Sequence, residues 1–138
     1  MTITKHAALL LLTLVGLTGL LSAQRSTAVK AQVPFAFVAN GHTMPAGECT
    51  IAVLVNGRTL LSIDSGKQHT FAVPIGDKSP STPKKTALVF HHYANRYFLV
   101  ALRREGGIGY QLPASRLERE LQALNIPSQV FTLVASAQ

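Results

Sequence analysis

The chain has 138 residues, one cysteine and a formal net charge of +7, from 13 Lys and Arg against 6 Asp and Glu. That length fits a single domain, and one cysteine excludes an intramolecular disulfide, so the fold must rest on packing. The positive balance favours loose contact with anionic envelope polymers, whereas the lack of a compact basic run with interleaved aromatic residues argues against a specific nucleic-acid site.

The first predicted element is a leader. Residues 1–6 contain one lysine and no acid, and residues 7–21 are an uncharged apolar stretch, which is the pattern of a secretory signal peptide. This stretch is shorter than the roughly 20 residues that a membrane-spanning helix needs. Small residues predict cleavage after Ala23 or Ala28, which makes residues 29–138 one exported domain, periplasmic or extracellular, without a transmembrane segment.

Short apolar runs follow the leader, and Gly, Pro, Asn and Asp separate them about every ten residues, a spacing typical of an all-β sandwich or barrel. The first predicted strand is residues 33–37. In it Val33, Phe35 and Phe37 share one face, and Pro34 favours a sheet edge because proline cannot donate a ladder hydrogen bond.

Three more strands are predicted to form a meander. A turn-rich link, residues 40–47, leads into the first of them. Asn56 and Gly57 tolerate the positive φ of a type I′ turn and predict a tight hairpin. Residues 65–67 form the next turn. The predicted strands of the meander are residues 49–55, 58–64 and 68–73.

A loop and a second hairpin come next. Residues 74–85 hold three prolines and no apolar periodicity, which predicts an exposed, mobile loop. Residues 86–93 and 96–104 flank a two-residue turn. The run 97–102 is apolar on both faces, as in a central strand, so we expect this hairpin at the heart of the core.

One helix is predicted, over residues 116–124. Ser115 and Glu118 have the spacing of a capping box, in which Glu118 caps the helix. Apolar residues recur at i, i+4 and i+7 in one stripe that we expect to pack on a sheet: Leu117, Leu121 and Leu124. Residues 130–134 then form a closing strand. The predicted fold is an antiparallel sandwich or partly open barrel of about seven to eight strands with one short C-terminal helix.

No motif for catalysis, a cofactor or a metal is found, so no catalytic residue is assigned. His91 and His92 are neighbours on a predicted strand and point to opposite faces, so they cannot both bind one ion without a bulge. A metal site built from distant residues would use His42, Glu48 and one of the pair. A hydrolase would need His91 or His92 beside Ser62 or Glu48 in one cleft.

Cys49 opens an apolar run in the second predicted strand. This position predicts a buried structural thiol. The alternative is an intermolecular bridge or a reactive thiol, which would need exposure and an electropositive neighbourhood.

Nine aromatic residues lie mostly within the predicted strands, where core packing accounts for them. The alternative is a ligand cavity inside a barrel or sandwich. Tyr93, Tyr97 and Tyr110 have polar tips suited to a cavity mouth, and together with His92 they are the predicted binding residues for a small apolar ligand.

Several short motifs occur in a fixed order along the mature chain. They are Val-Pro-Phe-x-Phe at residues 33–37, Met-Pro-Ala-Gly at 44–47, Tyr-Phe-Leu at 97–99 and Leu-Pro-x-Ser-x-x-Glu at 112–118. In this order the chain resembles a group of small exported β-rich proteins abundant in acidobacterial genomes. The resemblance covers most of the mature chain and implies an exported bacterial β-domain. It supplies no activity, substrate or catalytic residues.

The functional prediction is a noncatalytic secreted or cell-envelope interaction protein. It rests on the leader, the dense apolar strands and the lack of a catalytic motif. Two alternatives remain open, a carrier of a small apolar ligand and an unrecognised hydrolase.

Overall fold

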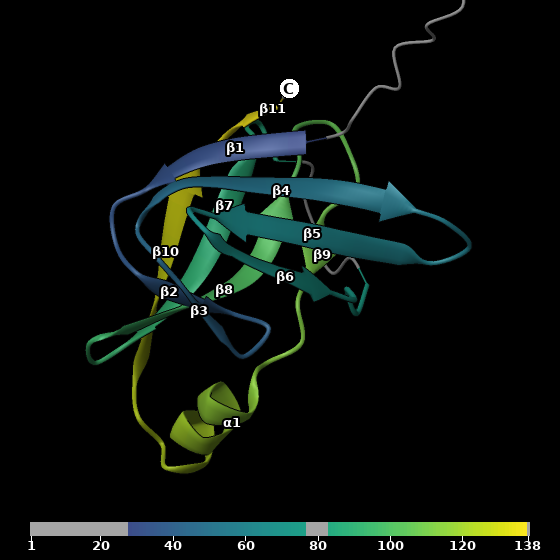
Figure 1. Cartoon of the computed structure of the whole chain (residues 1–138). Helices are drawn as coiled ribbons and strands as arrows, with labels where there is room; N and C mark the ends of the chain where they lie inside the picture. Colours follow the sequence, from purple (N-terminus) through teal and green to yellow (C-terminus); the bar gives the residue numbers. More distant parts are fainter. Residues whose placement is uncertain (1–27, 77–82, 138) are drawn as a thin grey trace, which may run out of the picture.

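The computed structural model describes residues 28–76 and 83–137, which form two packed β-sheets and one short helix (Figure 1). This confirms the predicted sandwich. The described strands number eleven, more than expected, because several are pieces of two or three residues. Residues 1–27 of the predicted leader and residues 77–82 of the predicted loop lie outside the described residues.

The five-stranded sheet contains both ends of the described chain. Its spatial order is β11 (Ser136–Ala137), β1 (Ala28–Val33), β4 (Gly47–Val55), β5 (Thr59–Ser65) and β6 (Gln68–Ala72). All its neighbouring strands are antiparallel. The predicted meander is confirmed as β4, β5 and β6, because the two hairpins bring these strands side by side.

The six-stranded sheet faces it. Its order is β10 (Ser128–Val134), β7 (Ala87–Tyr93), β8 (Arg96–Arg103), β2 (Phe37–Ala39) and β3 (His42–Met44), and β9 (Tyr110–Gln111) also pairs with β8. The predicted central hairpin is β7 and β8. Phe90 lies opposite Leu99 and Val89 opposite Ala101, so Val100 is an extra residue that forms a bulge.

The predicted strand over residues 33–37 is wrong. β1 ends at Val33, and the next three residues leave the five-stranded sheet, so that Phe37 begins β2 in the opposite sheet. Pro34 lies at this crossing, where its missing N–H costs no ladder hydrogen bond. The alternation in this segment therefore spans two sheets rather than one strand.

The two consecutive positive φ values of a type I′ turn lie elsewhere than predicted. Asn40 and Gly41 both have positive φ, 48° and 79°, and join β2 to β3 inside the segment expected to be only a link. Between β4 and β5 the loop has three residues, because Val55 lies opposite Thr59. Gly57 has a positive φ there and Asn56 does not, so this hairpin exists without the predicted type I′ turn.

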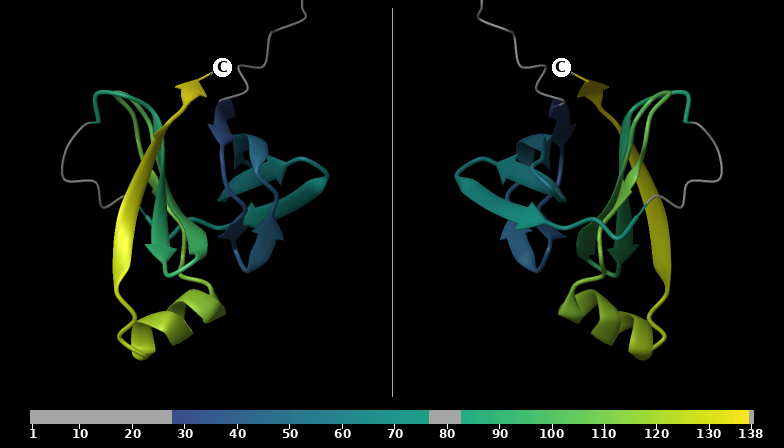
Figure 2. Two further views of the ribbon diagram at one scale, coloured as in Figure 1. Left: turned by 90° about the vertical axis from the view of Figure 1, so that its left-hand side faces the viewer. Right: turned by 90° about the vertical axis from the view of Figure 1, so that its right-hand side faces the viewer.

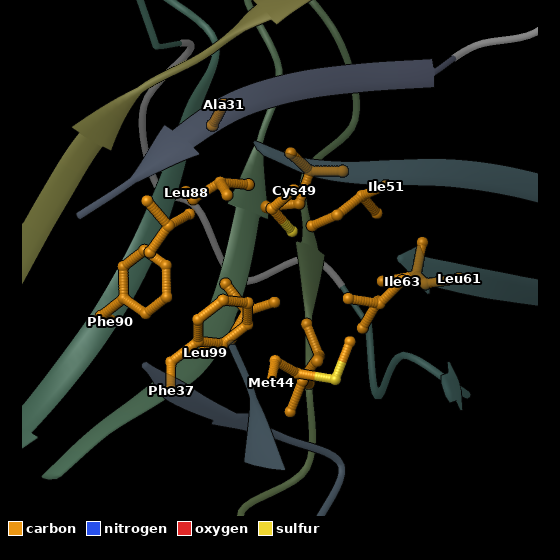
Figure 3. Packing of buried hydrophobic residues seen from close by; sticks show 14 of the residues in the cluster. Ala31, Phe37, Met44, Cys49, Ile51, Leu61, Ile63, Leu88, Phe90 and Leu99 are labelled. Carbon is orange, nitrogen blue, oxygen red and sulfur yellow. The ribbon is translucent and has the colours of Figure 1, made fainter. Parts of the chain in front are cut away.

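The core fills the space between the sheets. Figure 3 shows Cys49 and Ile51 from the five-stranded sheet pointing toward Leu88 and Leu99 of the opposite sheet. Cys49 is fully buried, as its place at the start of an apolar strand predicts. The apolar side chains of both sheets therefore hold the sandwich together without a covalent staple.

The helix α1 (Arg116–Ala123) begins where predicted, and Ser115 is its N-cap residue. The predicted apolar stripe of the helix does not supply its buried contact with the sheet. Leu124 is 71% exposed, while the one buried residue of the helix is Glu118. Among the described residues, no helix has the length and apolar character needed to cross a bilayer.

Candidate functional site

A shallow groove lies on the outer face of the six-stranded sheet, the face turned away from the core. Its volume is about 340 Å³, and strands β7, β8, β9 and β10 line it. We call it the outer groove. Its apolar lining includes Val89, Val100 and Val130, and its polar lining includes His91 and Arg103. The groove therefore offers an apolar floor with cationic or titratable groups beside it.

A buried polar network fastens α1 to this sheet. The Glu118 side chain is 3% exposed, and its Oε1 lies 2.8 Å from His91 Nδ1. The same oxygen accepts a hydrogen bond from the Tyr93 hydroxyl at 3.2 Å, and that hydroxyl accepts one from Gln122 Nε2 at 3.1 Å. A buried carboxylate needs such donors, because burial without them would cost several kcal/mol.

The network also sets the chemistry of His91. A carboxylate only accepts hydrogen bonds, so Nδ1 carries the proton toward Glu118. The second ring nitrogen, Nε2, is then left for a partner, and His91 is one of the residues that line the outer groove. This arrangement orients the imidazole to bind a polar group placed in the groove.

Glu118 was expected to complete a capping box. Half of that motif is present, because the Ser115 hydroxyl accepts a hydrogen bond from the Glu118 backbone N–H at 3.2 Å. The Glu118 carboxylate bonds to His91 and Tyr93 instead. These partners lie 27 and 25 positions away in the chain, so no local sequence spacing predicts them.

The four predicted ligand residues are divided among three places. Tyr93 is 3% exposed and belongs to the network with α1. Tyr97 stacks on His92, with ring centroids 4.1 Å apart, and on Phe35 at 3.7 Å. Tyr110 packs against the core and lines the outer groove. Ligand binding by these residues stays a prediction, and the structure does not gather them around one mouth.

The distant metal and hydrolase sets are not assembled. Glu48 lies in the five-stranded sheet and pairs with Lys30 at 3.5 Å, whereas His42 lies in β3 of the other sheet. The Ser62 hydroxyl, on β5 of the five-stranded sheet, donates to Asp64 at 3.2 Å. His91 lies on β7 of the other sheet and bonds to Glu118 instead. Over the described ranges, no group of three His, Cys, Asp or Glu side chains is placed to hold a metal ion.

The free edge of the six-stranded sheet is the second notable surface. β10 pairs with β7 on one side and is the last strand of its sheet. It contains no charged residue and no proline. Its exposed apolar side chains are Val130 at 67%, Phe131 at 40% and Val134 at 62%. Val130 also lines the outer groove, so edge and groove form one continuous surface.

Comparisons with protein-family models, with curated proteins and with solved structures find no match.

Burial makes Cys49 unreactive in the folded protein. Burial, together with the smaller effect of the negative charge of Asp64, raises the pKa of the Cys49 thiol from 9.0 to about 12. Because the thiolate is the reactive form, we expect iodoacetamide at pH 8 to leave the native protein unmodified and to alkylate it fully in urea. Intact mass measures both. Rapid alkylation of the native protein would show instead that the strand opens at Cys49.

The same pKa shift fixes the direction of a pH effect. Above pH 9 the unfolded thiol ionises while the buried thiol stays protonated. Ionisation then favours the unfolded state, so the contribution of Cys49 to stability is complete below pH 9 and declines as the pH rises toward 12.

Proposed function

We propose that this chain is a noncatalytic, exported interaction protein of the bacterial cell envelope or the secreted fraction, and that it binds its partner along β10 and the outer groove. The observation that carries the proposal is the uncharged, exposed apolar edge of β10 beside the groove. Folded proteins usually protect such an edge with lysine, proline, a bulge or a covering element. An edge without these devices is suited to pairing with another chain.

The groove adds a chemical preference to this surface. Val100 and Val130 offer apolar contact, and the Arg103 guanidinium offers hydrogen-bond donors to an acceptor group. With its proton on Nδ1, His91 offers Nε2 as a hydrogen-bond acceptor. Arg103 carries a positive charge, which favours a carboxylate or another anionic group on the partner. We infer a partner that combines apolar side chains with an acidic or anionic group.

Export is part of the proposal. Ala28 pairs with Ala52 at the start of β1, so cleavage after Ala28 would remove the first residue of that strand. Cleavage after Ala23 leaves β1 complete, and we favour this site for that reason. We also infer membership of the acidobacterial group, whose motifs coincide here with the crossing between sheets at residues 33–37 and with the N-cap of α1.

Site-specific photocross-linking tests the proposed surface. A benzoylphenylalanine at Thr132, exposed on β10, is compared with one at Thr43, exposed on β3 of the same sheet. We expect adducts from position 132 in the exported fraction and none from position 43. Equal adducts from both positions, or none from position 132, would remove β10 as the binding surface.

A small-ligand carrier is the second candidate. The volume of about 340 Å³ and the valines of the outer groove favour it, since that volume suits a small molecule. Native mass spectrometry of protein from the exported fraction distinguishes the two. A bound mass released on denaturation supports the carrier, and a bare protein mass supports the interaction protein.

A further inference from the structure

We propose that the partner of β10 is a second copy of this chain, paired antiparallel through the same strand about a twofold axis at Phe131. The inference rests on the proposed function and gives the β10 edge an occupant. Because β10 is uncharged, the second copy's β10 does not supply the anionic group inferred for the outer groove. Both six-stranded sheets would then continue into each other across the axis. Figure 2, left, shows β10 along its whole length, with no other described element drawn in front of it.

The direction of the backbone groups supports the pairing. The Ala135 N–H donates to the Thr86 carbonyl at 2.9 Å, which continues the regular register of β10 with β7. Backbone groups alternate in direction along a strand, so Phe131 bonds toward β7 while Val130 and Thr132 direct their N–H and C=O groups away from the sheet. These outward groups are the ones that a second strand would use.

The strand is complementary to itself. When Phe131 lies opposite Phe131 of the second copy, Val130 lies opposite Thr132 of that copy. The two residues of a Val130–Thr132 pair can then exchange two N–H···O hydrogen bonds. Ser128 lies opposite Val134 in the same way. The central pair of Phe131 side chains is of the close, non-hydrogen-bonded kind, in which side chains approach most nearly. All seven positions are uncharged, so pairing opposes no like charges.

The other edges of the described sheets are less suited to pairing. β9 and β11 have two residues each, and β3 has three. β6 is longer, but the Asn40 side chain donates to its Phe71 carbonyl at 2.7 Å and occupies part of that edge. Within the described residues, β10 is therefore the long edge that lacks a cover.

Analytical ultracentrifugation of the exported, leader-free chain tests the inference. A pairing of this size is a small interface, so we expect the average mass to rise toward twice the monomer mass between about 1 and about 300 µM. Thr132→Pro removes an outward N–H without touching the ladder to β7, and we expect it to remain a monomer. Thr132→Ala keeps that N–H and is the matched control, expected to dimerise.

A second variant tests the pairing independently, in case the proline variant does not fold. Val130→Lys places a charge on an exposed edge position and is expected to weaken dimerisation at least tenfold, with an unchanged circular dichroism spectrum. A wild-type monomer at about 300 µM, or a dimer that both variants leave intact, would overturn self-pairing.

The photocross-linking result separates this failure from failure of the proposed function. A wild-type monomer that gives adducts to an unrelated protein from position 132 overturns self-pairing and leaves the interaction proposal in place. A monomer without adducts from that position overturns both. An adduct of twice the chain mass supports both.

Discussion

Replacing Glu118 with alanine is expected to lower the free energy of unfolding by about 3 kcal/mol, because the change removes the acceptor of two buried hydrogen bonds. His91 Nδ1 and the Tyr93 hydroxyl both bond to Glu118 Oε1. Without it, the Tyr93 hydroxyl keeps only its bond from Gln122, and the His91 N–H loses its partner. Urea denaturation followed by circular dichroism measures the loss.

Two control variants separate the network from general effects on the helix. Glu120→Ala breaks only the exposed pair with Arg116, and we expect a change below about 0.5 kcal/mol. Glu118→Gln keeps an acceptor oxygen and is expected to cost about 1 kcal/mol. A loss for Glu118→Ala no larger than that for Glu120→Ala would show that the network does not hold α1 on the sheet.

The sequence predicts the parts of this fold that depend on local chemistry. The β7–β8 hairpin follows from a continuous apolar run, and the β4–β6 meander follows from turn residues between short strands. The start of α1 follows from the hydroxyl of Ser115, which caps the helix. Each of these features is decided by residues close to one another in the chain.

Features decided by distant residues were not predictable in this way. The alternation of Val33, Phe35 and Phe37 satisfies the period of one strand, and only the opposite sheet determines that the chain crosses over there. Phe35 lies in the crossing and stacks on Tyr97, with ring centroids 3.7 Å apart. The Glu118 carboxylate likewise accepts its hydrogen bonds from residues of β7, and no local sequence motif connects that strand to the helix.

The candidate site also depends on residues that are distant in the chain, and for that reason it was not predicted from the sequence. The polar tips of the tyrosines predicted a ligand-binding role for them, whereas the outer groove is lined mainly by β7 and β8 and includes Tyr110 but not Tyr93 or Tyr97. Apolar residues in a predicted strand are normally assigned to the core. Val130 and Val134 are exposed because β10 ends its sheet, and strand order is a tertiary property.

The largest destabilisation is expected from Phe90→Ala, at about 4 kcal/mol, because the change removes a large side chain from a site that cannot collapse easily. Phe90 is fully buried beside the bulge of the central hairpin. Its ring meets Phe35 and Phe37 edge to face, with centroids 5.1 and 5.4 Å apart. The ring therefore joins β7 to the crossing between the sheets, and its loss leaves a cavity at that junction.

Phe71→Ala is the matched control, since Phe71 lies on β6 and is 46% exposed, and we expect it to cost less than about 1 kcal/mol. Both values come from urea denaturation of the chain without the predicted leader. A domain of this size has a total stability of roughly 5–15 kcal/mol, so Phe90→Ala is expected to leave a measurable unfolded fraction that iodoacetamide detects at Cys49. Equal losses for the two variants would mean that the sandwich is not held at the crossing, and that burial at Phe90 does not translate into stability.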